Sequence, residues 1–168
     1  MDRPDSCGEV TTVPVVKLMS HPVVCVTPGM SLNDALVVML RTGLRHLVVV
    51  DAERRCRGVL ADRAVTAAWA ADPSALEWES VGAVLDPRPA VVPADATAAD
   101  VARLMCLDRV DAAAVIDRGG YPLGVVTGGD LVTLMATHVP LPPEMAEEDM
   151  ASEDVAEEDV VEGDPQAN

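Results

Sequence analysis

The chain has 168 residues, which suffices for one ordinary domain or for two small repeats that share a core. Apolar residues make up 49% of it, but with no Phe, one Tyr and two Trp it offers few aromatic side chains for base stacking or for an aromatic cage. The formal net charge of −16 leaves no counterion release to drive binding to a phosphate backbone, so no nucleic-acid partner is expected.

The apolar runs and the cysteines bear on where the protein works. Runs such as residues 47–50 fall far short of the ~20 residues that span a bilayer, and no basic stretch followed by an apolar one marks a secretion signal. The cysteines (Cys7, Cys25, Cys56 and Cys106) form no CxxC pair and have no histidine at metal-ligand spacing. Cys25 and Cys106 lie in apolar patterns, which predicts small buried side chains. We expect a reduced, cytoplasmic, bacterial protein with no metal and no membrane partner.

The first repeat, residues 15–71, follows a polar N-terminus, residues 1–14, that is expected to be flexible. Its first element is an apolar strand over residues 23–26. Ser31 and Asp34 then form the capping box of a helix. The spacing of the apolar residues in this helix predicts one buried face: Leu32, Ala35, Leu36, Met39 and Leu40.

Two strands and a second helix complete this repeat. Residues 47–50 are apolar at every position, which is typical of a strand covered on both faces, and residues 58–60 form its hairpin partner. The last helix opens at Asp62. The predicted order of elements is β-α-β-β-α.

The same order returns 66 residues later, where Met39 aligns with Met105 and Gly58 with Gly124. Residues 72–80 form a linker, and residues 81–138 form the second repeat. Its elements are a strand over 90–92, a helix capped by Thr97 and Asp100, strands over 113–116 and 124–126, and a helix from Gly128. We predict an α/β fold of two pseudo-symmetric units packed as one module.

The C-terminal segment, residues 139–168, differs in composition from the repeats. Residues 144–164 hold 11 acidic residues and no basic one, so high charge and low hydrophobicity predict disorder. The segment is either a solubilising tail or a docking segment for a basic partner.

The repeated stretches resemble a tandem pair of CBS motifs (cystathionine-β-synthase motifs), the unit called a Bateman module. The matching stretches are residues 16–19, 24–28, 44–51 and 58–60 in the first repeat, and 91–93, 113–117 and 124–131 in the second. The resemblance implies regulation rather than catalysis. It implies two clefts between the motifs, a ligand such as AMP, ADP, ATP or S-adenosylmethionine, and a module that often forms homodimers.

By this resemblance, the ribose hydroxyls are held by the Asp of a G-h-h-T/S-x-x-D stretch. Only the second repeat keeps that stretch, with Thr127 and Asp130, whereas the first has Ala61 and Ala64 at these positions. A carboxylate can accept hydrogen bonds from both hydroxyls and an alanine methyl cannot, so at most one ribose site is expected.

The same Thr127 and Asp130 also read as a capping box for the last helix. The adjacent Gly128 and Gly129 favour a ligand site, because two glycines in a first turn otherwise cost stability.

The resemblance also places the phosphates of the ligand at the turn before the apolar strand of the other motif. That turn is Arg45-His46 in the first repeat and Asp111-Ala112 in the second. We therefore expect Asp130 to share one pocket with the basic pair, and the acidic turn to lie in the other pocket. Ser20, Cys25 and Val125 are expected at the adenine end.

No P-loop, G-x-G-x-x-G stretch or nucleophile elbow occurs, so no enzyme activity is expected. One hypothesis is a stand-alone module that senses an adenosine ligand and signals to an unidentified regulated protein. The alternative is a ligand-free dimeric scaffold that binds a protein partner through its acidic tail or through a face of the disc that paired CBS motifs form.

Overall fold

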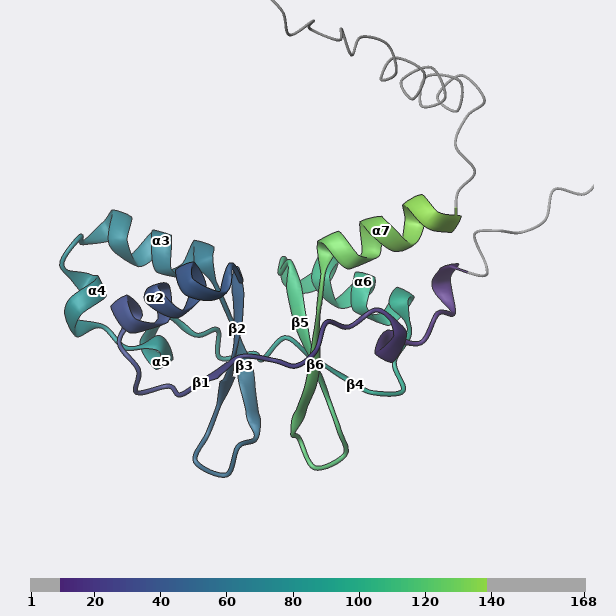
Figure 1. The fold of residues 1–168 in the computed structure, drawn as a ribbon, viewed down its shortest axis with the longest axis horizontal. Coiled ribbons are helices and arrows are strands. Elements are labelled where there is room, and N and C mark those ends of the chain that lie inside the picture. Colours follow the sequence, from purple (N-terminus) through teal and green to yellow (C-terminus); the bar gives the residue numbers. More distant parts are fainter. Residues whose placement is uncertain (1–9, 139–168) are drawn as a thin grey trace, which may run out of the picture. The chain divides into compact units, whose positions relative to one another are not determined.

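The computed structural model describes residues 10–138, which form two three-stranded sheets with helices (Figure 1). The first repeat comprises β1 (Cys25–Val26), α2 (Leu32–Thr42), β2 (His46–Val50), β3 (Cys56–Ala61) and α3 (Asp62–Ala71). The second comprises β4 (Val91–Pro93), α6 (Ala98–Asp108), β5 (Ala112–Ile116), β6 (Pro122–Thr127) and α7 (Gly128–His138). Short helices are η1 (Val15–Lys17), α4 (Ala75–Trp78) and α5 (Val81–Val84). The predicted α/β fold with two β-α-β-β-α units is confirmed, and the predicted acidic tail lies outside the described residues.

The two sheets have the same pairing pattern. In each, the first strand pairs parallel with the central strand, and the central strand pairs antiparallel with the third. Val49 faces Gly58 in one sheet and Val115 faces Gly124 in the other, and the register shifts one residue later in both. The offset of 66 residues therefore holds in the backbone as well as in the sequence.

Each repeat buries one face of its first helix. Leu32, Ala35 and Met39 of α2 are at most 4% exposed, and the equivalent face of α6 is also buried. Leu40 departs from the prediction, because its side chain is 75% exposed. Eight residues after Leu32, it lies about 80° further round the helix, at the edge of the buried face.

The segments that precede the first strands are exchanged between the repeats. Val15 of η1 is buried in the core of the second repeat, and Val81 of α5 is buried in the core of the first. The Val15 N–H donates to the Ala96 carbonyl and the Val81 N–H to the Met30 carbonyl, both at 2.9 Å. The boundaries at residues 15 and 81 therefore delimit the sequence repeats, whereas each hydrophobic core includes a segment from the other repeat.

Three segments differ from the expected organisation. Pro14, expected in a flexible N-terminus, forms a β-bridge with Thr97. The expected linker 72–80 contains α4. β1 is shorter than the strand expected over residues 23–26, since its ladder with β2 comprises only Cys25 and Val26.

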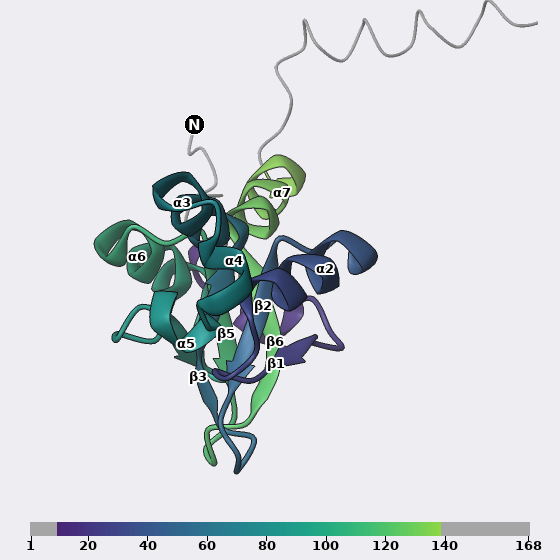
Figure 2. The same ribbon diagram turned by 90° about the vertical axis from the view of Figure 1, so that its left-hand side faces the viewer.

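The two sheets pack against each other. Val48, Val50 and Ala114 form a buried cluster between them, and β3 contacts β5. The Cys56 N–H donates to the Gly120 carbonyl at 2.8 Å, which joins the two hairpins. The hairpin turns lie at the end opposite to α3 and α7 in both views (Figures 1 and 2).

The expected burial of Cys25 and Cys106 is wrong, since both are exposed. Cys25 lies on the edge strand β1, and Cys106 lies on the solvent side of α6, one residue after the buried Met105. Cys7 lies outside the described residues.

Candidate functional site

A cavity of about 510 Å³ opens between the two repeats. The first repeat contributes the chain before β1 and the turn before β2, and the second contributes the end of β6 and the start of α7. Six predicted site residues line it: Ser20, Arg45, His46, Val125, Thr127 and Gly129. The fold thus brings these six residues, which come from both repeats, to one cleft.

The back of this open cleft is held by a short pairing between the repeats. The Ser20 N–H donates to the Val125 carbonyl at 2.8 Å, and the Val125 N–H donates to the Ser20 carbonyl at 3.1 Å. Gly124 permits this close approach, since a Cβ there would lie 2.5 Å from the Met19 sulfur. Ser20 and Val125 are therefore fixed side by side on the cleft wall.

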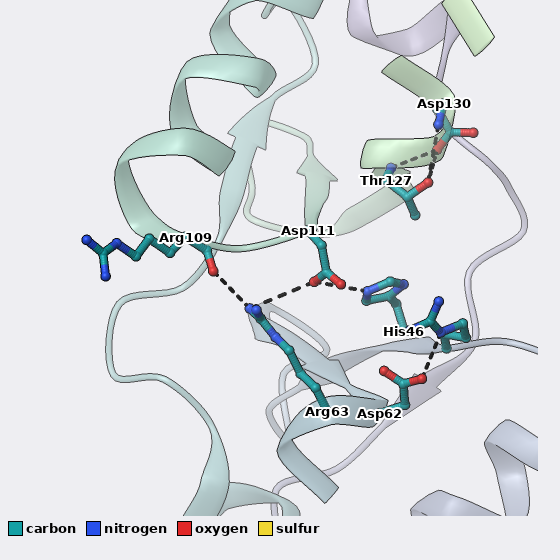
Figure 3. A network of polar contacts seen from close by, with 8 residues as sticks. His46, Asp62, Arg63, Arg109, Asp111, Thr127 and Asp130 are labelled. Atoms are coloured by element: carbon teal, nitrogen blue, oxygen red, sulfur yellow. Dashed lines mark hydrogen bonds and ion pairs between the residues drawn. The ribbon is translucent and has the colours of Figure 1, made fainter. Parts of the chain in front are cut away.

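Thr127 and Asp130 form the capping box of α7. The Thr127 N–H and hydroxyl both donate to Asp130 Oδ2, at 2.7 Å and 2.8 Å, and the Asp130 N–H approaches Thr127 Oγ1 at 3.4 Å (Figure 3). Within residues 10–138, Oδ1 of Asp130 has no hydrogen-bond partner. One carboxylate oxygen therefore caps the helix and the other is available.

Asp130 and Cys25 differ from the other predicted residues, because neither lines the cavity itself. Asp130 adjoins the lining residue Gly129 and is half-buried. Cys25 lies beyond the lining residues Val23 and Val24, on the edge strand. A cleft role for Cys25 has no support in the structure.

Arg45 is held at the mouth of the open cleft by an ion pair. Its Nε donates to Asp62 Oδ2 at 2.7 Å, and its side chain is 72% exposed. The hydrogen bond from Arg45 lowers the pKa of Asp62, and the same pair raises the pKa of Arg45. The charge of Arg45 is thus largely matched before any ligand arrives.

The acidic turn lies in the smaller cleft on the other side as expected, since Asp111 and Ala112 line it, but Asp111 also lines the open cleft together with His46. His46 begins the central strand β2, and Asp111 directly precedes the central strand β5. Because these two strands pack against each other through Val48, Val50 and Ala114, the two turns meet. Asp111 Oδ1 lies 3.3 Å from His46 Nε2 and 3.8 Å from Arg63 Nη2 (Figure 3). The orientation toward His46 is not that of a hydrogen bond, so the buried Nε2 has no hydrogen-bond partner among the described residues.

The equivalent cleft on the other side is nearly closed, with a cavity of about 40 Å³. Arg63 lines it at the position equivalent to Gly129, and its Nη2 donates to the Arg109 carbonyl at 3.1 Å (Figure 3). A long side chain therefore stands where the open cleft has only backbone. The sequence contains a signal for this difference beyond the pair Ala64 and Asp130, since the offset of 66 residues also aligns Arg63 with Gly129.

No group of three or more His, Cys, Asp or Glu side chains within residues 10–138 is placed to hold a metal ion. No helix in that part of the chain is long and apolar enough to cross a membrane.

The described residues form a pair of repeats with an open cavity between them, and the chain belongs to the CBS domain family. The family model for the CBS domain matches residues 10–71 and again residues 81–137. Two tandem CBS domains are thus present.

Solved structures of CBS domain pairs share this fold. The pair from protein MJ0100, in complex with 5′-methylthioadenosine and S-adenosyl-L-methionine, is 17% identical with a TM-score of 0.69, over 76% of this chain and 99% of that one. CBSX2 in complex with AMP is 25% identical with a TM-score of 0.61, over 74% and 97%. The cytosolic domain of the Mg²⁺ channel MgtE in complex with ATP is 26% identical with a TM-score of 0.60, over 77% and 52%.

One curated relative is also similar in sequence. A homoserine O-acetyltransferase from Methanosalsum zhilinae is 25% identical over 131 residues, which are 78% of this chain and 26% of that protein. The chain therefore spans about a quarter of the length of that relative.

Proposed function

We propose that the protein is a regulatory, non-catalytic CBS pair that binds one adenosine-containing ligand in the open cleft and signals to a partner protein. The observation that carries this proposal is the cavity of about 510 Å³, which brings the predicted residues of both repeats together. The similar CBS pairs with S-adenosylmethionine, AMP or ATP support an adenosine ligand.

In this proposal the second repeat holds the ribose. The free Oδ1 of Asp130 accepts hydrogen bonds from the ribose hydroxyls, each worth about 1.5–3 kcal/mol because the acceptor is charged. The adenine lies near Ser20 and Val125, where paired backbone and the apolar Val23 and Val24 form the wall.

Isothermal titration calorimetry with AMP, ATP and S-adenosylmethionine tests the proposal. Asp130→Ala removes both the ribose acceptor and a helix cap, so the control must remove only a cap. Asp100→Ala is this control, because Asp100 forms the same capping box with Thr97 on α6, away from the cleft. We expect both variants to lose about 1 kcal/mol of stability and only Asp130→Ala to lose binding.

The closed cleft predicts a stoichiometry of one ligand per chain. Absence of heat and of thermal stabilisation with all three ligands would refute the proposed function. Equal loss of binding in Asp130→Ala and Asp100→Ala would refute the ribose role of Asp130.

The alternative, a ligand-free dimeric scaffold, has one supporting observation. Trp69 on α3 and Met135 on α7 occupy equivalent positions in the two repeats and are 52% and 57% exposed. These helices lie at the same end of the module (Figures 1 and 2), so together they offer apolar surface to a second copy. Light scattering of the wild type and of Trp69→Asp, without ligand, tests this alternative: a scaffold dimer persists in the wild type and dissociates in the variant.

A further inference from the structure

The charged groups around the open cleft form a balanced set rather than a basic one. Arg45 is paired with Asp62, and Arg63 approaches Asp111. Asp130 adds a further carboxylate beside the start of α7. Among these groups only Arg45 and Asp111 line the cavity, so one guanidinium group and one carboxylate stand on its wall, with His46 as the remaining titratable group there.

This arrangement disfavours a ligand with several phosphates. Asp111 lines the cavity at the turn beside Arg45 and His46, where a 5′ substituent would lie if the ribose is at Asp130. A carboxylate there repels each phosphate charge, and Asp62 already balances the positive charge of Arg45. The helix dipole at the start of α7 favours an anion, but Asp130 already occupies that end.

The free atoms of the same groups suit a zwitterion. Only Nε of Arg45 bonds Asp62, so its two Nη groups remain for a ligand carboxylate within the described part of the chain. Within residues 10–138, Asp111 contacts His46 and Arg63 through Oδ1, which leaves Oδ2 to accept from an ammonium group. Asp111 thus offers one acceptor oxygen and Arg45 offers two donor groups on the same cleft.

We propose that the open cleft selects an adenosine ligand whose 5′ substituent is a cationic, zwitterionic amino-acid chain, the class of S-adenosylmethionine, over the adenosine phosphates. This inference rests on the proposed function and narrows its ligand class. Asp111 accepts from the ammonium group and balances the sulfonium charge, and Arg45 binds the carboxylate.

The test compares four probes by calorimetry on the full chain: S-adenosylmethionine, 5′-methylthioadenosine, AMP, and ATP with and without Mg²⁺. The wild type is expected to bind S-adenosylmethionine at least about tenfold more tightly than AMP or either form of ATP. Asp111→Asn keeps the shape and removes the charge, so it should weaken S-adenosylmethionine about 10- to 100-fold, the loss of one charge-assisted hydrogen bond. It should strengthen AMP and leave the uncharged 5′-methylthioadenosine unchanged.

The outcomes separate this inference from the proposed function. If AMP or ATP binds the wild type as tightly as S-adenosylmethionine, the selection is wrong and the adenosine site stands. If Asp111→Asn weakens 5′-methylthioadenosine as much as S-adenosylmethionine, Asp111 acts on the shape of the cleft and the inference is overturned. If no probe binds the wild type, the proposed function fails first.

Discussion

Replacing Gly124 by alanine tests the contact that holds the open cleft together. A Cβ at Gly124 would lie 2.5 Å from Sδ, 2.6 Å from Cγ and 2.8 Å from Cβ of Met19. Rotation of the Met19 side chain can move Sδ and Cγ away, but it leaves its Cβ in place. The backbone of Met19 must therefore shift as well.

That shift is resisted by the neighbouring residue. Ser20 is bound to Val125 by two backbone hydrogen bonds of 2.8 Å and 3.1 Å, directly beside the new methyl group. Overpacking of a filled site costs about 1–3 kcal/mol, and we expect Gly124→Ala to lower the free energy of unfolding by that amount. Because Ser20 lines the cleft, the variant should also bind ligand less tightly.

Urea unfolding followed by circular dichroism measures the effect, with Gly29→Ala as the control. A Cβ at Gly29 meets nothing within 4 Å, so this variant should match the wild type or exceed it by about 0.4–1 kcal/mol. If Gly124→Ala unfolds at the same urea concentration as Gly29→Ala, the Ser20–Val125 pairing does not hold Met19 as argued.

Two further predictions concern titratable groups. Arg45 lowers the pKa of Asp62 in the folded state, so the unfolded chain binds more protons in acid. The Asp62 carboxylate therefore stabilises the fold at a pH above its unfolded pKa of about 3.9. This stabilisation is lost as the pH falls through the lower pKa of the folded state. Urea unfolding between pH 3 and pH 7 should therefore show a weaker pH dependence in Asp62→Asn, and an unchanged slope would contradict the pairing. Burial raises the pKa of Cys56, so its thiolate is scarce at neutral pH, whereas Cys106 is exposed. Alkylation with iodoacetamide, followed by peptide mass spectrometry, should modify Cys106 first; a faster reaction at Cys56 would contradict this.

The sequence by itself determined the repeat, the order of elements and the difference between the repeats at the positions of Thr127 and Asp130. Local signals are enough for these features, since capping boxes, buried helix faces and apolar strands are written in neighbouring residues. The contrast between Asp130 and Ala64 is visible as soon as the repeats are aligned. The helix start at Gly128 follows from the same local pattern.

Only the tertiary structure decided which side chains share a cleft. Asp111 and His46 meet because their strands abut across the two repeats, and no pattern within either repeat records that contact. The same holds for Arg63, which narrows the second cleft, and for Val15, which is buried in the other repeat. Periodicity reports how a residue faces its own helix or strand, whereas a cleft between repeats depends on residues distant in sequence that packing brings together.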